Sequence, residues 1–306
     1  MIGIGRKKKE HTIGIWMCTV MVAVLLSGCK KTDEEILSTS LTASASIKSV
    51  EADMKVEGTI SLDFQGAQQD IPVLVESDEF VFTDSGKAKM LTDVSVMGRD
   101  SQTQSYLQKE GEDYYVYTGV EDIESGEMSW TKMRLAGSDE WMQQLGMDSL
   151  QQFKDHADSF VKLEERQEND REYQLYQYTM AADEQTKVLK RYATIVQSAL
   201  GKTWDTQTMI DSMAENLGDI VMTVWIDKEK EVIYKIEYPI TDMMNQMSHV
   251  VQENLDEILP KEQSFFMGDM ELSVSDMTVE ILYKNYDKIQ DFTIPEEALQ
   301  TQESED

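Results

Sequence analysis

The sequence predicts an α+β fold built on one long antiparallel sheet with helices on one face. Two observations predict it. Many short segments alternate apolar and polar residues and are separated by turn residues, as in a meander of hairpins. The helical segments come in blocks and do not alternate singly with strands, which disfavours a parallel sheet. A sheet of about ten strands does not stay flat, so we expect it to curl into a partial barrel.

The first element after the N-terminal region is a helix. Thr32 supplies a hydroxyl that can cap a helix. The three acidic residues that follow it fall in the first turn, where the helix dipole favours negative charge. A loose apolar stripe beginning at Ile36 continues the pattern. The sequence therefore predicts a helix over residues 33–48.

The period then changes to two. Residues 52–64 alternate apolar and polar side chains until Gly66, which is typical of a half-buried antiparallel strand. Turn signals such as Asp84-Ser85-Gly86 separate the segments that follow. These segments predict further strands at 71–75, 79–83, 88–96, 103–108, 114–118 and 128–133.

The second half mixes both patterns. Helices are expected from Ser138 to about residue 159, over 183–217 with a break near Gly201, and over 241–259 up to Pro260. Strands are expected at 161–167, 172–180, 220–226, 232–238 and 270–283, with a short pairing segment at 288–294 and a helical turn at 295–299. We interpret residues 33–299 as a single domain, followed by an acidic, disordered tail at 300–306.

Composition excludes several classes of function. The formal charge is -30, from 28 Lys and Arg against 58 Asp and Glu, so the chain repels nucleic-acid phosphates and no nucleic-acid partner is expected. Only 2 Cys are present, which excludes a disulfide scaffold. Hydrophobic residues make up 41% of the chain, enough for a core.

The N-terminal region has the features of an export signal. Residues 6–9 are basic, and residues 13–26 are apolar or weakly polar, a stretch shorter than the roughly 20 residues of a membrane-spanning helix. Leu26-Ser27-Gly28-Cys29 resembles a bacterial lipobox, in which the Cys thiol receives a diacylglyceryl group. We therefore expect a lipoprotein signal peptide at 1–28 and a lipidated anchor and tether at 29–32. The alternative is an ordinary secretory signal with an incidental Cys.

Lipidation at Cys29 would fix the protein's location. The mature protein would lie on the outer face of the bacterial cytoplasmic membrane, with the membrane as its partner through the lipid, and we expect a monomer. Two acyl chains hold a protein durably, at about 0.8 kcal/mol per buried methylene. Cys18 would leave with the signal, so no free thiol would remain. We expect the rest of the acidic protein to be repelled by the bilayer and to lie away from it.

Catalytic residues are hard to find. His156 and His249 are the only histidines after the signal, and neither has a Cys or a second His at ligand spacing. The abundant carboxylates make some acid pair inevitable, so spacing selects no glycosidase pair. We expect no enzyme activity, no cofactor and no metal site.

Methionine is the unusual composition signal, with 20 in the chain. Several fall at helical spacing, and flexible thioethers suit surfaces that adapt to different apolar ligands. The alternative interpretation is that they fill an ordinary core beneath the sheet. The candidate cavity-lining residues are Met209, Met213, Met243, Met244, Met247, Phe265 and Phe266.

A set of motifs spread over most of the mature chain resembles a known group. They are the lipobox, the run from Ser49 to Met54, Val224–Asp227 leading into Ile233–Ile236, and Tyr283–Asp287 followed by Ile294–Ala298. Together they resemble LolA-like and LppX-like lipoproteins, especially the uncharacterised Gram-positive branch. The resemblance implies an unclosed half β-barrel with helices covering the concave face and an apolar cavity. LolA-type carriers are soluble shuttles, whereas Cys29 would tether this chain.

Two functions remain open. The first is a tethered protein that binds a lipid, an acyl chain or another apolar molecule in the half-barrel. The second is a protein-interaction or envelope-structural lipoprotein whose concave face is filled by its own helices.

Overall fold

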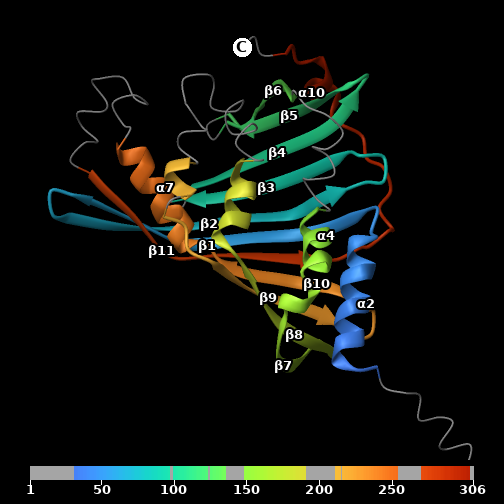
Figure 1. Cartoon of the computed structure of the whole chain (residues 1–306). Coiled ribbons are helices and arrows are strands. Elements are labelled where there is room, and N and C mark those ends of the chain that lie inside the picture. The colour runs from blue at the N-terminus through green and yellow to red at the C-terminus, as the bar shows by residue number, and fades with distance from the viewer. Residues whose placement is uncertain are drawn as a thin grey trace, which may run out of the picture.

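The computed structural model describes residues 31–96, 99–122, 125–135, 148–190, 211–214, 216–253 and 270–303 (Figure 1). These residues form one antiparallel sheet of eleven strands in the order β6-β5-β4-β3-β2-β1-β11-β10-β9-β8-β7. The strands are β1 Val50–Phe64, β2 Ala67–Phe82, β3 Ala88–Val96, β4 Arg99–Glu110, β5 Asp113–Glu121, β6 Met128–Leu135, β7 Val161–Glu168, β8 Arg171–Met180, β9 Ile220–Asp227, β10 Val232–Pro239 and β11 Met270–Tyr283.

The expected fold class is confirmed, because the sheet is open and its two ends, β6 and β7, do not pair with each other. Consecutive strands pair as neighbours from β1 to β6 and again from β7 to β11. In the second series, helical residues separate β8 from β9, and helix α7 (Thr241–Glu253) lies between β10 and β11. The last strand, β11, then pairs with β1 and joins the two series at the middle of the sheet.

Three helices lie on one side of the sheet, which we call the inner face (Figure 1): α2 (Asp33–Ala45), α4 (Asp148–Asp155) and α7 (Thr241–Glu253). Thr32 caps α2 as expected, since its side chain accepts from Glu35 N and the Glu35 carboxylate accepts from Thr32 N. Leu41 of α2 and Leu150 of α4 are fully buried. They pack with inner-face residues of the sheet, including Val224 and Ile233, into the main core. None of the described helices is long and apolar enough to cross a membrane.

Two expected strands prove to be one. Residues 71–75 and 79–82 belong to the single strand β2, which ends one residue before the expected Thr83. This strand has an irregularity between Glu76 and Phe80, which appears in its pairing with both β1 and β3. The irregularity interrupts the alternation of apolar and polar residues around Ser77, which made one strand look like two.

The expected pairing segment at 288–294 is not a strand. It crosses the opposite side of the sheet, the outer face, where Phe292 and Ile294 pack with Tyr106 and Tyr117. The short helix α10 (Glu296–Gln300) follows it on the same face and buries Ala298. The apolar residues that suggested a strand therefore cover an aromatic cluster instead.

Candidate functional site

One face of the two central strands, β1 and β11, carries no charged side chain. On β1, the charged residues all fall at odd positions, Glu51 to Asp63, and the even positions from Val50 to Leu62 carry none. The register pairs even residues of β1 with apolar residues of β11, such as Met54 with Ile281 and Val56 with Val279. Successive side chains of a strand point to opposite faces, so the inner face of β1 and β11 carries no charged side chain. This is notable in a chain whose net charge is -30.

We call the part of this surface beyond the main core the apolar strip. It is continuous across the pairs Val56–Val279, Ile60–Val274 and Leu62–Leu272 of β1 and β11. Val274, Met277 and Val279 are buried in a separate cluster, against which side chains of β1 and α7 are partly buried. The strip consists of Met54, Val56, Ile60 and Leu62 of β1, Ile71, Val73 and Val75 of β2, and Leu272, Val274, Met277 and Val279 of β11.

Helix α7 is fastened to the backbone of β11 at two points. Beyond Pro239, β10 no longer pairs with β11, so backbone groups of β11 need other partners. Thr241 Oγ1 accepts from Met277 N at 2.9 Å, and Asn245 Oδ1 accepts from Val274 N at 2.7 Å. The Asn245 Nδ2 group also donates to Val274 O at 2.9 Å. Sequence reasoning missed this role, although Thr241 after Pro239 is a recognisable helix-start signal.

The candidate methionines occupy different environments. Met243 and Met244 of α7 pack against the cluster on β11, whereas Met247 is 37% exposed. Met213 is buried. The remaining candidates Met209, Phe265 and Phe266, together with the lipobox Leu26-Ser27-Gly28 and Cys29, lie outside the described residues.

Two buried hydroxyls on β2 and β3 border the strip. Ser77 lies opposite Met54, and Thr92 lies on the neighbouring strand β3. Both residues are buried, and neither hydroxyl oxygen has a hydrogen-bond partner in the part of the chain that the structure describes. Such groups leave hydrogen-bonding capacity next to an apolar surface.

Large apolar side chains are also exposed around the inner face. By register, Phe64 at the tip of the β1–β2 hairpin and Val120 of β5 share this face with the strip. They are 45% and 47% exposed. Together with Met247, they leave apolar surface that the described helices do not cover.

Two hollows in the described part of the chain lie elsewhere and are lined mainly by polar side chains. One, of about 430 Å³, lies under the C-terminal segment and includes Glu79, Lys89 and Phe292 in its lining. The other, of about 300 Å³, includes His156 and Glu184, whose Nε2 and Oε1 atoms are 3.1 Å apart. No group of three or more His, Cys, Asp or Glu in the described ranges could hold a metal ion.

Tyr178 links the second hollow to the core. Its hydroxyl donates to Glu184 Oε2 at 3.2 Å. Burial, followed by the nearby Glu184 carboxylate, raises the pKa of Tyr178 to about 12. The phenol therefore stays protonated, which fits a structural hydrogen bond that positions Glu184.

A family model matches residues 32–303, almost the whole chain after the expected signal. The chain belongs to DUF6612, a family of unknown function. The match of this DUF6612 chain covers all eleven strands and α10. No curated protein matches its sequence significantly.

The solved structures that match include two mycobacterial proteins. LprF from Mycobacterium bovis is 12% identical, with 86% of the DUF6612 chain and 95% of LprF covered and a TM-score of 0.38. The lipoprotein LppX from Mycobacterium tuberculosis is 10% identical, with 85% and 99% covered and a TM-score of 0.37. A putative outer membrane lipoprotein-sorting domain from Vibrio parahaemolyticus is 10% identical, with 87% and 95% covered and a TM-score of 0.22.

At such identities and TM-scores we take no ligand or activity from these structures.

Proposed function

We propose that this protein is a non-enzymatic, membrane-anchored extracytoplasmic lipoprotein that binds a lipid, an acyl chain or another apolar ligand on its inner face. In this proposal, the signal at 1–28 is removed and Cys29 carries the lipid that holds the protein on the outer face of the cytoplasmic membrane. The observation that carries the ligand proposal is the uncharged inner face of β1 and β11 in a chain of charge -30.

The strip has the properties that an apolar ligand needs. Its side chains are aliphatic or thioether, so an acyl chain placed against them would lose water without leaving a charge unpaired. Met243 and Met244 lie over it, and flexible methionines adapt to ligands of different shape. The unpaired hydroxyls of Ser77 and Thr92 could accept or donate hydrogen bonds to a polar end of the same molecule.

A second function is favoured by the other half of the inner face. There α2 and α4 already fill the space above the sheet with buried side chains such as Leu41 and Phe153. If the protein's own chain covers the strip in the same way, the protein is an interaction or envelope-structural lipoprotein without a small-molecule ligand.

Native extraction followed by mass spectrometry separates the two functions. We expect lipid bound in molar proportion to the wild-type protein. The variant Ile60→Asp places a carboxylate on the strip and should lose that lipid, whereas Thr59→Asp places the same charge at the neighbouring position on the outer face and should retain it. An empty wild-type protein would instead support the interaction function.

A further inference from the structure

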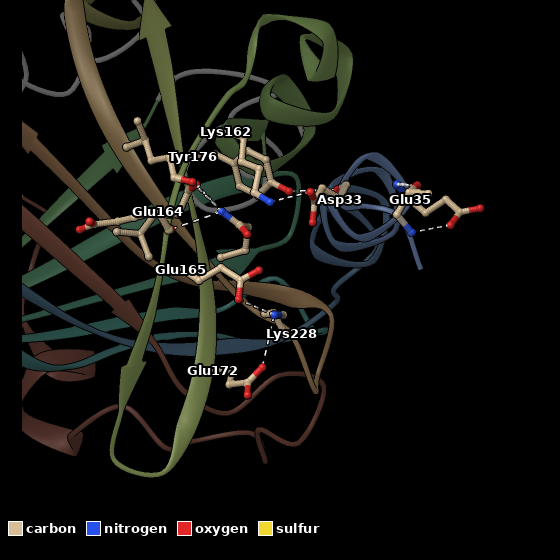
Figure 2. Close-up of polar contacts among 12 residues, drawn as sticks. Asp33, Glu35, Lys162, Glu164, Glu165, Glu172, Tyr176 and Lys228 are labelled. Atoms are coloured by element: carbon tan, nitrogen blue, oxygen red, sulfur yellow. Dashed lines mark hydrogen bonds and ion pairs between the residues drawn. The ribbon is translucent and has the colours of Figure 1, made fainter. Parts of the chain in front are cut away.

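The start of the described chain is fixed at one end of the sheet. Lys31 Nζ is 2.5 Å from Glu231 Oε1 in the turn between β9 and β10. Lys162 Nζ of β7 is 2.5 Å from Asp33 Oδ2, and the Tyr176 hydroxyl of β8 donates to Asp33 O at 3.0 Å. Figure 2 shows Lys162 and Tyr176 directed at Asp33 at the start of α2.

The distance from this point to the proposed lipid is short. Only Lys30 stands between Cys29 and Lys31 in the sequence. Two residue steps of extended chain span at most about 7 Å between Cα atoms. That length is comparable to the headgroup layer of a bilayer, roughly 5 to 7 Å on each side. A lipid on Cys29 would therefore hold the start of α2 at the membrane surface.

We infer that the edge of the sheet around β7 is the surface of this protein that lies against lipid headgroups. We call it the anchor edge, and it comprises β7, the β7–β8 turn at Asn169 and Asp170, and the β9–β10 turn from Lys228 to Glu231. The inference rests on the proposed lipidation of Cys29. It goes further by assigning which surface faces the membrane and which faces away.

Exposed apolar side chains lie among the charged residues of the anchor edge. β7 is an edge strand, because in the described sheet it pairs only with β8. Its residues Val161 and Leu163 are 58% and 37% exposed. These are two of the seven large hydrophobic residues exposed in the described chain. Headgroup contact would remove their apolar surface from water.

Charge at the anchor edge is locally compensated. Lys228 lies 3.0 Å from Glu165 and 3.3 Å from Glu172, as Figure 2 shows, and Arg166 lies 2.8 Å from Glu164. The hydrogen bond with Glu165 raises the pKa of Lys228 further above its ordinary value. Such ion pairs lower the electrostatic repulsion between the anchor edge and anionic lipids. Salt further screens the repulsion from more distant acidic residues, beyond a Debye length of about 8 Å.

The turn nearest the tether is also rigid. The carboxylate of Asp227 is buried, and its Oδ1 accepts from Glu229 N and Lys230 N at 2.9 Å each. A turn fixed in this way can hold the body at a defined angle to the membrane. The strip, whose far end is the β1–β2 hairpin tip, then opens away from the bilayer, because that tip and the start of α2 lie at opposite ends of the molecule (Figure 1).

Single-cysteine labelling of the lipidated full-length product tests this orientation, since Cys29 would be the only native cysteine and its sulfur would be blocked. We place a bimane label at Val161→Cys and Lys230→Cys on the anchor edge. Matched control sites are Ala67→Cys beside the β1–β2 tip and Thr131→Cys on the opposite edge strand β6, both exposed. The protein is reconstituted on phosphatidylcholine–phosphatidylglycerol vesicles that contain headgroup-nitroxide lipid.

The expected result is quenching at positions 161 and 230 at least threefold stronger than at positions 67 and 131. Equal quenching at all four positions, or stronger quenching at 67, would overturn the orientation. Insertion of a 20-residue Gly-Ser linker after Lys30, with a root-mean-square length of about 25 Å, should abolish the difference. An unchanged pattern would overturn the short tether as its cause.

Vesicle flotation of the unlabelled protein distinguishes failure of the orientation from failure of the anchor. Protein that does not float with the vesicles lacks the lipid, which refutes the anchoring on which this inference depends. Protein that floats but shows uniform quenching is anchored without a preferred face, which refutes only the orientation.

Discussion

Gly58 of β1 faces Met277 of β11 so closely that a Cβ at position 58 would lie 2.8 Å from Met277 Cα and 2.9 Å from Met277 Cβ. The register of β1 and β11 shifts at this point, next to Asp276, which has a positive φ of 51°. Because Gly58 has no Cβ, Met277 can pack directly against the β1 backbone where the register shifts, and its side chain lies on the apolar strip.

Gly58→Ala is therefore expected to destabilise the protein by about 1 to 3 kcal/mol, because the contacting atoms include backbone that cannot move aside easily. Urea unfolding of the mature protein measures the change. Gly218→Ala is the control, since nothing lies within 4 Å of its added Cβ. A loss at position 58 no larger than at position 218 would show that the two strands are spaced differently.

Trp225 should be far more important for stability than the charged turn beside it. Its ring is buried and lies edge-on to Tyr173, with the two ring centroids 5.9 Å apart. Its Nε1 donates a hydrogen bond to Glu237 Oε2 at 2.6 Å. Trp225→Ala is expected to cost about 3 to 5 kcal/mol in urea unfolding.

The neighbouring charges provide the comparison for Trp225. Glu229→Gln should change stability by less than about 0.5 kcal/mol. Lys228→Gln should cost up to about 1 kcal/mol, because Lys228 forms two partly exposed ion pairs. Similar small effects at all three positions would mean that Trp225 is not in the core.

Alternation predicted the sheet well because one face of each central strand is uncharged. Strand β11 begins and ends at the expected residues 270 and 283, and β8, β9 and β10 differ from expectation by one residue at an end. The pattern failed at Ser77, because an irregularity in β2 breaks a period of two without ending the strand.

The candidate site was only partly predictable. Its methionines were selected by helical spacing, which places Met243, Met244 and Met247 on one helix but does not reveal that Met247 is the exposed one. The fastening of Asn245 to Val274 depends on where β10 stops pairing with β11, a tertiary relation that local sequence does not contain. The prediction of a pairing segment at 288–294 is wrong for the same reason, since its apolar residues pack on a surface contributed by β4 and β5.

Alkaline pH should destabilise the fold through buried tyrosines. Burial is the largest cause that raises the pKa of Tyr173, Tyr176 and Tyr178 to about 12 from an ordinary 10. A raised pKa means that the stabilisation is complete below pH 10 and is lost as the pH rises from 10 to 12.

Absorbance of phenolate at pH 11 should therefore be lower in the folded protein than in urea. Tyr178→Phe should reduce that difference while keeping the ring that packs against Phe153. Equal phenolate absorbance in folded and unfolded protein would contradict the burial of these hydroxyls.

Cys29→Ala should leave unprocessed precursor that fatty-acid probes do not label, because the thiol that would accept the diacylglyceryl group is gone. Metabolic labelling and gel mobility measure both effects, and Cys18→Ala is the matched control, expected to be processed and labelled normally. Normal labelling of Cys29→Ala would refute the lipobox interpretation.

The central claim is that the inner face binds an apolar ligand, and thermal melting with and without lipid tests it most directly. Replacing Met244 and Met247 by Ala should destabilise the protein, with a loss of up to about 2 to 5 kcal/mol at Met244 and less at the exposed Met247. A ligand that binds only the folded state adds about 2.7 kcal/mol at a hundredfold excess over Kd. We predict that saturating fatty acid or phospholipid raises the melting temperature of the wild type and recovers part of the loss in the double variant. If neither melting temperature moves with saturating lipid, the binding function is wrong and the interaction function takes its place.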